Sequence, residues 1–173
     1  MLRPHEFTEY EPGLSSILDV GAKAGIPINI MCSGNLDLFS QLAAKHPNTQ
    51  MVIDHLGIPQ PHLPPVPENP FADLDKVVSL AKHDNVVIKI SGAGTLSHEP
   101  FPYADIWEPL SKIFNAFGLD RCLWGTDWTR AVELLTYKEG VEAFRVTDSL
   151  SDTERATLMG GSLSKIYNWS PKK

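Results

Sequence analysis

Hydrophobic residues along this chain alternate between two kinds of spacing. Apolar residues three or four positions apart, which are typical of helices, occupy residues 14–24, 36–43, 71–81 and 106–117. Short continuous apolar runs, which are typical of buried strands, occupy residues 28–31, 51–53, 86–90 and 121–124. Helical spacing returns in two closing segments, 132–144 and 158–167. The alternation predicts four β/α repeats around a parallel sheet, because parallel strands need long and usually helical connections.

The number of repeats limits the choice of α/β fold. A (β/α)8 TIM barrel needs eight repeats and about 250 residues, whereas this chain has 173 residues. The pattern therefore predicts a partial barrel of about four βα units. An open doubly wound sheet is the alternative, but the sequence contains no glycine-rich phosphate loop of the Rossmann or Walker type. A proline-rich loop over residues 58–70 is long for a compact domain, and such loops are often functional.

Composition narrows the class of protein. The net charge of −6 and the absence of a Lys/Arg cluster argue against nucleic-acid binding, which needs concentrated positive charge. No apolar stretch approaches the roughly 20 residues of a membrane span. Residues 1–6 lack the apolar core of a signal peptide, so we expect a cytoplasmic location. Cys32 and Cys122 lie in or beside apolar runs and are expected to be buried free thiols.

Two polar residues stand where predicted strands end. His55 follows the run 51–53, and Asp127 follows the run 121–124 between two tryptophans. An imidazole can ligate a metal or hold a substrate oxygen, and a carboxylate can bind a metal or take a proton from water. The structural alternatives are a histidine bonded to a loop carbonyl and an aspartate that caps the next helix. Because barrels present catalytic groups at strand ends, we predict that the two side chains converge on one mouth.

Three further residues are candidates for substrate binding. Lys89 lies within a strand and points either inward to a carboxylate or outward to solvent. Ser91 ends the same strand. Small polar residues at strand ends more often form hydrogen bonds with the backbone than with a substrate. Arg130 could bind an anionic substrate or form a salt bridge on a helix surface. The remaining histidines share no metal-ligand spacing, although His98 could reach the mouth from its loop.

These motifs in combination resemble a known family. The matching segments are 43–47 (AAKHP), 51–57 (MVIDHLG), 87–92 (VIKISG), 117–128 (FGLDRCLWGTDW) and 160–167 (GGSLSKIY). They resemble the amidohydrolase-related TIM-barrel hydrolases, and within these the branch of 2-pyrone-4,6-dicarboxylate lactonase and the sugar lactonases. The resemblance covers nearly all of residues 1–173 and corresponds to the C-terminal portion of the family domain, the last four βα units.

The resemblance implies roles for the two strand-end residues. His55 corresponds to the histidine after the sixth barrel strand, which polarises the scissile carbonyl or helps to hold a metal. Asp127 corresponds to the aspartate after the eighth strand, which binds the metal or activates water. The family's His-x-His pair on the first strand has no counterpart here, and residues 31–33 stand where metal-dependent members often have another histidine. A divalent metal such as zinc and metal-independent lactonase chemistry are therefore equally plausible.

The implied function is hydrolysis of a lactone of a small carboxylated or sugar-like substrate. The alternatives are a non-catalytic or truncated fragment of such an enzyme and a relative of the family's decarboxylases. Half a barrel leaves apolar faces uncovered, so we also expect homo-oligomerisation or self-association. With part of the catalytic set missing, we expect the isolated chain to be weakly active or inactive.

Overall fold

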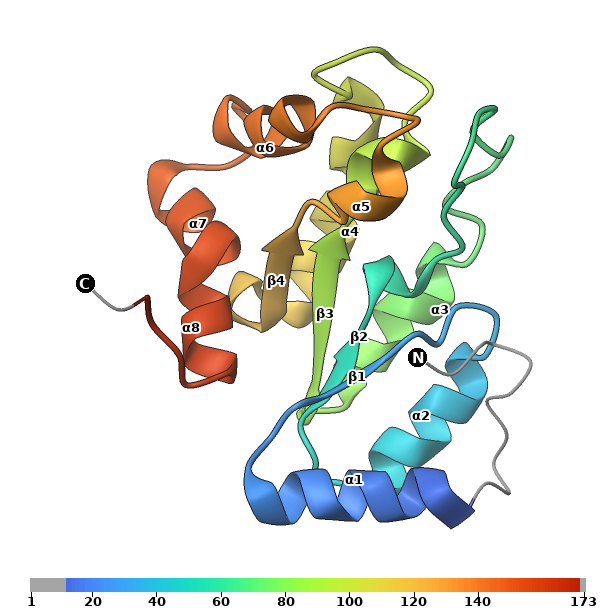
Figure 1. Cartoon of the computed structure of the whole chain (residues 1–173), viewed down its shortest axis with the longest axis vertical. Helices are drawn as coiled ribbons and strands as arrows, with labels where there is room; N and C mark the ends of the chain where they lie inside the picture. Colours follow the sequence, from blue (N-terminus) through green and yellow to red (C-terminus); the bar gives the residue numbers. More distant parts are fainter. Residues whose placement is uncertain (1–11, 172–173) are drawn as a thin grey trace.

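A four-stranded parallel sheet forms the centre of the protein (Figure 1). The computed structural model describes residues 12–171. The strands are β1 (Ile28–Ile30), β2 (Met51–Ile53), β3 (Val86–Ser91) and β4 (Cys122–Gly125), and they pair in chain order. Each predicted strand is confirmed to within one or two residues. The sequential order and the helical connections are those of four successive units of a (β/α)8 barrel.

Helices connect the strands and close the chain. α1 (Pro12–Ala24) precedes β1, and the connecting helices are α2 (Leu36–Lys45), α3 (Leu74–Ser79) and α4 (Trp107–Phe117). After β4 follow α5 (Trp128–Ala131), α6 (Tyr137–Arg145), α7 (Asp152–Ala156), a π-helical turn (Thr157–Gly161) and α8 (Ser162–Ile166). Short 3-10 turns cover His55–Gly57, Leu80–Lys82, Ala93–Leu96, Ala104–Ile106 and Leu119–Arg121.

One closing helix begins later than its apolar spacing predicts. The pattern predicts a helix from residue 132, but α6 begins at Tyr137 because a capping box starts it there. The Thr136 hydroxyl accepts a hydrogen bond from the Glu139 backbone N–H, and the Glu139 carboxylate accepts one from the Thr136 backbone. Such a cap satisfies backbone donors that the first helical turn leaves unpaired.

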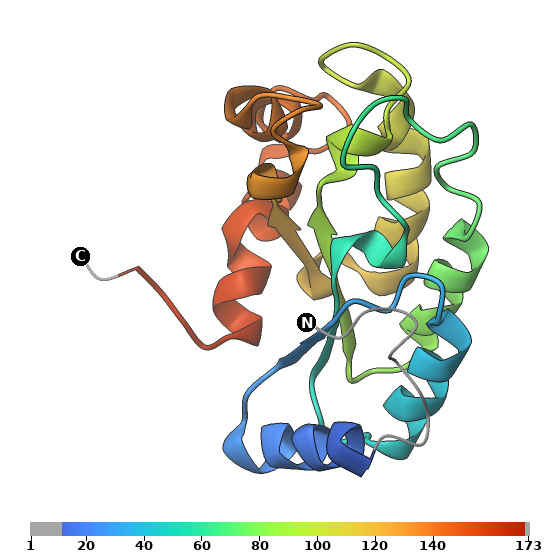
Figure 2. The same cartoon turned by 45° about the vertical axis from the view of Figure 1, so that its right-hand side comes forward.

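The two faces of the sheet have different neighbours. Ile30, Ile53, Ile88 and Cys122 are in register and belong to the large apolar core beneath α2, α3 and α4. In Figures 1 and 2 these three helices lie on one side of the sheet and leave its other face open to view. We call this second face the inner face, because it corresponds to the interior of a barrel; it carries Asn29, Val52, Val87, Lys89 and Leu123.

The C-terminal helix covers part of the inner face. Leu163, Ile166 and Tyr167 pack against a small apolar cluster of strand residues on this face. The Tyr167 hydroxyl also donates a hydrogen bond to Asn29 Oδ1 at 2.6 Å, which links the end of the chain to β1. Within residues 12–171, no helix is both long and apolar enough to cross a bilayer.

Candidate functional site

A strained turn presents His55 at the end of β2. His55 and Leu56 have positive φ angles of 51° and 62°, and Gly57 continues with 66°. Glycine adopts this left-handed conformation readily. For each of the other two residues the conformation costs on the order of 1–3 kcal/mol of folding free energy. The turn changes the direction of the backbone after β2. As a result, the His55 side chain points into the mouth at the carboxyl end of the sheet.

Asp127 occupies an equivalent place after β4. Its φ of 51° is also left-handed, and it stands at the N-cap position of α5. Its side chain makes no capping hydrogen bond. Instead, Asp127 Oδ2 lies 2.7 Å from Arg130 Nε and 3.2 Å from His55 Nδ1. The capping alternative is therefore wrong for this carboxylate, and the predicted convergence of His55 and Asp127 is confirmed.

The contacts of His55 favour one tautomer of its ring. Nδ1 lies 3.2 Å from Asp127 Oδ2 and 3.0 Å from Ser91 Oγ. Because an ionised carboxylate only accepts hydrogen bonds, a proton on Nδ1, donated to Ser91 Oγ, is the tautomer that suits the nearby Asp127. The lone pair of the neutral ring is then on Nε2, for which no hydrogen-bond partner is found within residues 12–171.

Burial keeps this imidazole neutral near pH 7. The side chains of His55 and Asp127 are each 14% exposed. Burial lowers the pKa of His55 from its ordinary value, and Arg130 and Lys89 lower it further, while Asp127 and Asp54 oppose the shift. The first of these effects is the largest, because desolvation disfavours the charged imidazolium.

Arg130 connects Asp127 to the proline-rich loop. Its Nε donates to Asp127 Oδ2, its Nη1 donates to the Gln60 backbone oxygen at 3.0 Å, and its Nη2 donates to Gln60 Oε1. Three of the five guanidinium N–H groups are thus committed to protein partners. Arg130 is a half-buried group in the site wall, which differs from a salt bridge on a helix surface.

A cavity of about 580 Å³ lies beside these residues. Its walls combine apolar and polar side chains from the ends of β1, β2 and β4 and from the loop. They are Met31, Ser33, His55, Ile58, Pro59, Gln60, His62, Asp127, Thr129 and Arg130. A volume of this size is sufficient for a small-molecule ligand.

The other two predicted substrate-binding residues lie behind or beside this cavity. Ser91 is 3% exposed and contacts the His55 ring. Lys89 is on the inner face, where its Nζ lies 2.9 Å from Asp54 Oδ1, at ion-pair distance but outside hydrogen-bond geometry. Of the two orientations considered for Lys89, the inward one is confirmed. Neither residue lines the cavity wall.

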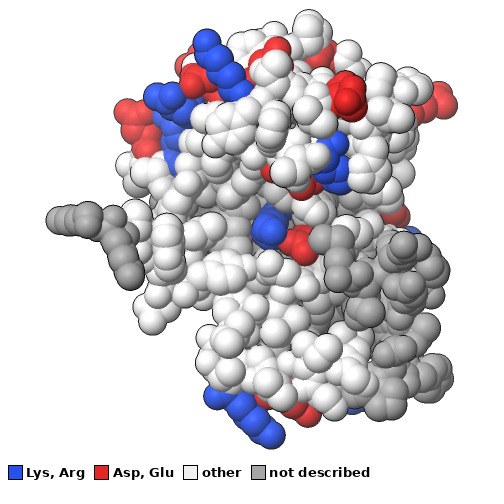
Figure 3. Space-filling model, in the orientation of Figure 1, with Lys and Arg blue, Asp and Glu red and all other residues white. Residues whose placement is uncertain are grey.

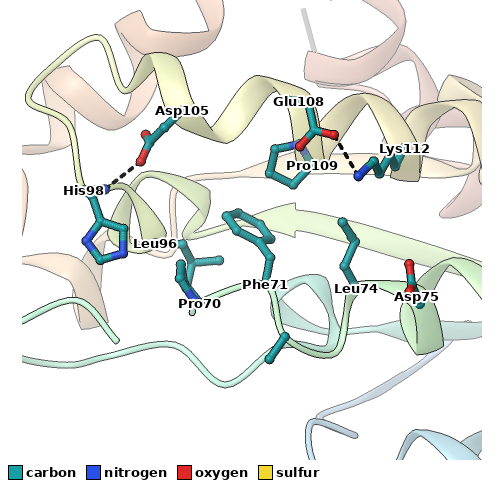
Figure 4. A pocket seen from close by; sticks show the side chains of 11 residues that line it. Pro70, Phe71, Leu74, Asp75, Leu96, His98, Asp105, Glu108, Pro109 and Lys112 are labelled. Atoms are coloured by element: carbon teal, nitrogen blue, oxygen red, sulfur yellow. Dashed lines mark hydrogen bonds and ion pairs between the residues drawn. The ribbon is translucent and has the colours of Figure 1, made fainter. Parts of the chain in front are cut away.

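The structure excludes the mouth as the place of His98, and it adds a wall of the site that sequence reasoning overlooked. His98 does not reach the mouth; it lines a separate hollow of about 400 Å³ near Phe71 and α4 (Figure 4). There its backbone N–H donates to Asp105, which also accepts from Ser97. Gln60 was not predicted, because an amide in a proline-rich loop carries no local signal of a partner elsewhere in the chain.

The described residues offer too few donors for a zinc centre. A catalytic zinc is normally held by three protein ligands, and this site brings together His55 and Asp127. Their facing atoms, Nδ1 and Oδ2, already contact each other. Over residues 12–171, no group of three or more His, Cys, Asp and Glu side chains is placed to hold a metal ion. The donor set present in this part of the chain does not fit a zinc site by itself.

Solved structures share this fold. An amidohydrolase from Burkholderia multivorans with bound zinc superposes with a TM-score of 0.76 and 22% identity, over 92% of this chain and 58% of that chain. A TIM-barrel protein from Bordetella bronchiseptica gives a TM-score of 0.67 and 16% identity, over 93% and 52%. A structure named for 2-pyrone-4,6-dicarboxylic acid hydrolase from Pseudomonas putida gives 0.67 and 20% identity, over 99% and 61%. The predicted partial TIM barrel is confirmed.

A curated relative supports the lactonase branch. The 4-sulfomuconolactone hydrolase of Rhizobium radiobacter is 36% identical over 80 residues, which are 46% of this chain and 25% of that protein. The chain thus spans less than two thirds of the length of each of these relatives. The amidohydrolase family profile matches residues 2–168. This chain therefore belongs to the amidohydrolase family, as a partial TIM barrel with homologues that hydrolyse lactones.

Proposed function

We propose that this chain contributes to a hydrolase that opens the lactone ring of a small carboxylated or sugar-like substrate with an activated water. The contact of 3.2 Å between His55 Nδ1 and Asp127 Oδ2 carries the proposal. It favours the tautomer that leaves the Nε2 lone pair available as a base, in the manner of the histidine–aspartate pairs of other hydrolases.

The proposed reaction needs one base and one proton carrier. His55 Nε2 accepts a proton from a water molecule while the water oxygen bonds to the lactone carbonyl carbon. Asp127 holds Nδ1–H and stabilises the imidazolium that forms. When the tetrahedral intermediate collapses, the ring C–O bond breaks and the leaving alkoxide takes the proton back from Nε2. The products are a carboxylic acid and an alcohol in one open chain.

The role of Asp127 in this proposal differs from the water-activating role that the family resemblance implies. Asp127 Oδ2 already accepts a hydrogen bond from Arg130 Nε and lies 3.2 Å from His55 Nδ1, so its contacts hold it in the site wall. The neutral imidazole is the better base near pH 7.

We propose that the Arg130 guanidinium, which lies in the cavity wall, binds the substrate. Arg130 lines the cavity and retains N–H groups beyond those that contact Asp127 and Gln60, which suits recognition of a carboxylate. Lys89 and Ser91 remain predicted substrate-binding residues, and Ser91 acts through its contact with His55.

Because the incomplete donor set predicts slow turnover by this chain, substrate binding is tested separately from turnover. Carboxylated lactones and their ring-opened acids are titrated into 15N-labelled protein, and the side-chain signals of His55 and Arg130 are followed. We expect members of this panel to shift both signals. If no carboxylated or sugar lactone perturbs either signal, the proposal is wrong.

Turnover is then compared between the wild type, Asp127→Asn and the control Asp120→Asn. Asp120 is an exposed aspartate paired with Lys165 on the surface. Any hydrolysis by the wild type should fall by about 10²–10⁴-fold in Asp127→Asn, the usual contribution of acid–base catalysis, and persist in Asp120→Asn. Hydrolysis that Asp127→Asn leaves intact would contradict the proposed chemistry.

A further inference from the structure

Gln60 makes a set of contacts in the wall of the cavity that no catalytic step accounts for. We propose that Gln60 is a positioning residue: it fixes the guanidinium of Arg130 and, through it, holds the Asp127 carboxylate toward His55. The catalytic consequence rests on the proposed function, whereas the positioning itself rests on contacts alone.

The donor end of the Gln60 side chain bridges two strand ends. Its Nε2 donates to the backbone oxygen of Ser91 at 2.9 Å and to that of His55 at 3.2 Å. The Ser91 carbonyl ends β3, and the His55 carbonyl, which also accepts from the Ile58 backbone N–H, follows the end of β2. The amide therefore ties the proline-rich loop to the two residues that face each other across Nδ1 and Oγ.

The acceptor end of the same residue holds Arg130. Gln60 Oε1 accepts from Nη2 and the Gln60 backbone oxygen accepts from Nη1, so two neighbouring acceptors face two guanidinium nitrogens. The opposite edge of the guanidinium donates from Nε to Asp127. Hydrogen bonds along both edges restrict rotation of the planar guanidinium, and this holds the carboxylate oxygen that faces His55.

The orientation of the Gln60 amide follows from its surroundings. The nitrogen faces two carbonyl oxygens, which only accept, and the oxygen faces a guanidinium, which only donates. Reversing the amide would oppose donor to donor and acceptor to acceptor. A glutamate here would likewise place a charged oxygen against two carbonyls, so glutamine matches both sets of partners.

A glycine makes room for this side chain. Gly92 has a φ of +70°, and a Cβ at this position would collide with Gln60 Oε1 and lie 3.2 Å from Arg130 Nη2. The close approach shows that the amide is packed against the backbone that follows β3 and is not lying loosely over the cavity.

The competing explanation is that Gln60 only anchors the loop. In that case, its loss would lower stability but leave the Arg130–Asp127 contact unchanged. Positioning instead predicts that the contact itself loosens. The Arg130 Nε–H proton reports this contact directly, because it is the atom that Asp127 binds.

The test compares Gln60→Leu with a matched control, Gln50→Leu. Gln50 is also partly buried and also donates from its side chain to a backbone oxygen, that of Asn85 at 2.8 Å, at the amino end of the strands. Leucine keeps the approximate size of both side chains and removes their hydrogen bonds. The Arg130 Nε–H signal of 15N-labelled protein is assigned with Arg130→Lys, and its hydrogen exchange is measured alongside urea unfolding.

We expect Gln60→Leu to speed exchange of the Arg130 Nε–H proton by about tenfold, the scale set by losing hydrogen bonds to a charged group. Gln50→Leu should leave this exchange rate unchanged even where it lowers stability. A folded Gln60→Leu protein with an unchanged Arg130 signal would overturn the proposal and leave Gln60 as a loop anchor.

A second measurement covers the case in which Gln60→Leu does not fold. In the wild type, the side-chain amide protons of Gln60 and the Arg130 Nε–H should exchange slowly together; rapid exchange of either would overturn the proposal. Both measurements are made without substrate. Failure of lactone binding or turnover therefore bears on the proposed function alone, and failure here bears on Gln60 alone.

Discussion

His55 Nδ1 lies 3.2 Å from Asp127 Oδ2, although the two residues follow different strands and each requires a left-handed backbone to face the other. Strained residues of this kind persist where the surrounding structure holds them, and they concentrate at functional sites. The pair and the cavity beside it give the half-barrel a defined chemical centre at the carboxyl ends of its strands.

The lowered pKa of His55 predicts a dependence on pH. A general base must be unprotonated, so hydrolysis should be constant near pH 7 and decline as the pH falls through a value below the ordinary 6.5. Because the pKa of His55 is lower in the folded chain than in the unfolded chain, acidification protonates His55 of the unfolded chain first. The free energy of unfolding should therefore also decrease below about pH 6.5. The His55 ring protons, followed by NMR across this range, measure the pKa.

Removing the Asp127 charge should lower this pKa further. Asp127 is the largest influence that raises the pKa of His55, against the dominant effect of burial. We therefore expect the NMR midpoint of His55 to move to lower pH in Asp127→Asn and to stay in place in Asp120→Asn. A midpoint that rises in Asp127→Asn would mean that the carboxylate does not face the imidazole in solution.

The close approach at Gly92 can be tested against a second glycine. Gly92→Ala introduces both a left-handed alanine and a collision with Gln60, whereas Gly34→Ala introduces a left-handed alanine in open space. The left-handed backbone of the alanine alone should lower the free energy of unfolding by about 1–2 kcal/mol in each variant. Urea unfolding should show a larger loss for Gly92→Ala. Equal losses would mean that Gln60 moves aside without cost.

The two cysteines should resist thiol reagents. Cys32 and Cys122 are fully buried, and burial raises the pKa of each thiol to about 12. Because the thiolate is the reactive form, we expect negligible labelling of the folded protein at pH 8 and complete labelling in denaturant. Fast labelling of the native protein at either position would show that the surrounding core opens readily.

The elements and the central pair of the site could be predicted from the sequence. The apolar runs that end at Asp54-His55 and at Thr126-Asp127 predict strands, and the carboxyl ends of parallel strands meet at one edge of a sheet. That rule brings His55 and Asp127 to one mouth, whereas the left-handed turns that aim them at each other are seen only in the structure.

The remaining features depend on contacts between distant segments. The position of Gln60 depends on Arg130, seventy residues later in the chain, and no local pattern reports such a pairing. The sequence left the direction of Lys89 open, because a lysine in a strand fits either face until its partner is known. That partner is Asp54, on the neighbouring strand end. The sequence likewise left open whether His98 reaches the mouth; its loop turns toward α4, where Asp105 holds its backbone.

Self-association is the last prediction, and it follows from the incomplete sheet. Within the described residues, β1 and β4 each pair with one neighbour only, and unpaired strand edges promote association. In the middle of the face seen in Figure 3, a blue and a red group lie side by side within largely uncharged surface. The helix that leads into β1 also exposes Ile17 and Val20, at 52% and 62%. We therefore expect association that increases with concentration, measured by light scattering or sedimentation velocity.

A pair of charged substitutions locates the surface involved. Val20→Lys places a cation on α1, the helix that leads into the edge strand β1. Val146→Lys places one at a comparably exposed valine at the end of α6. Desolvating a lysine in an apolar contact is unfavourable, so Val20→Lys should shift the equilibrium toward monomer, while Val146→Lys should not. A wild-type protein that stays monomeric at high micromolar concentration, with a cooperative melt, would contradict the prediction, because the half-barrel would then be self-sufficient.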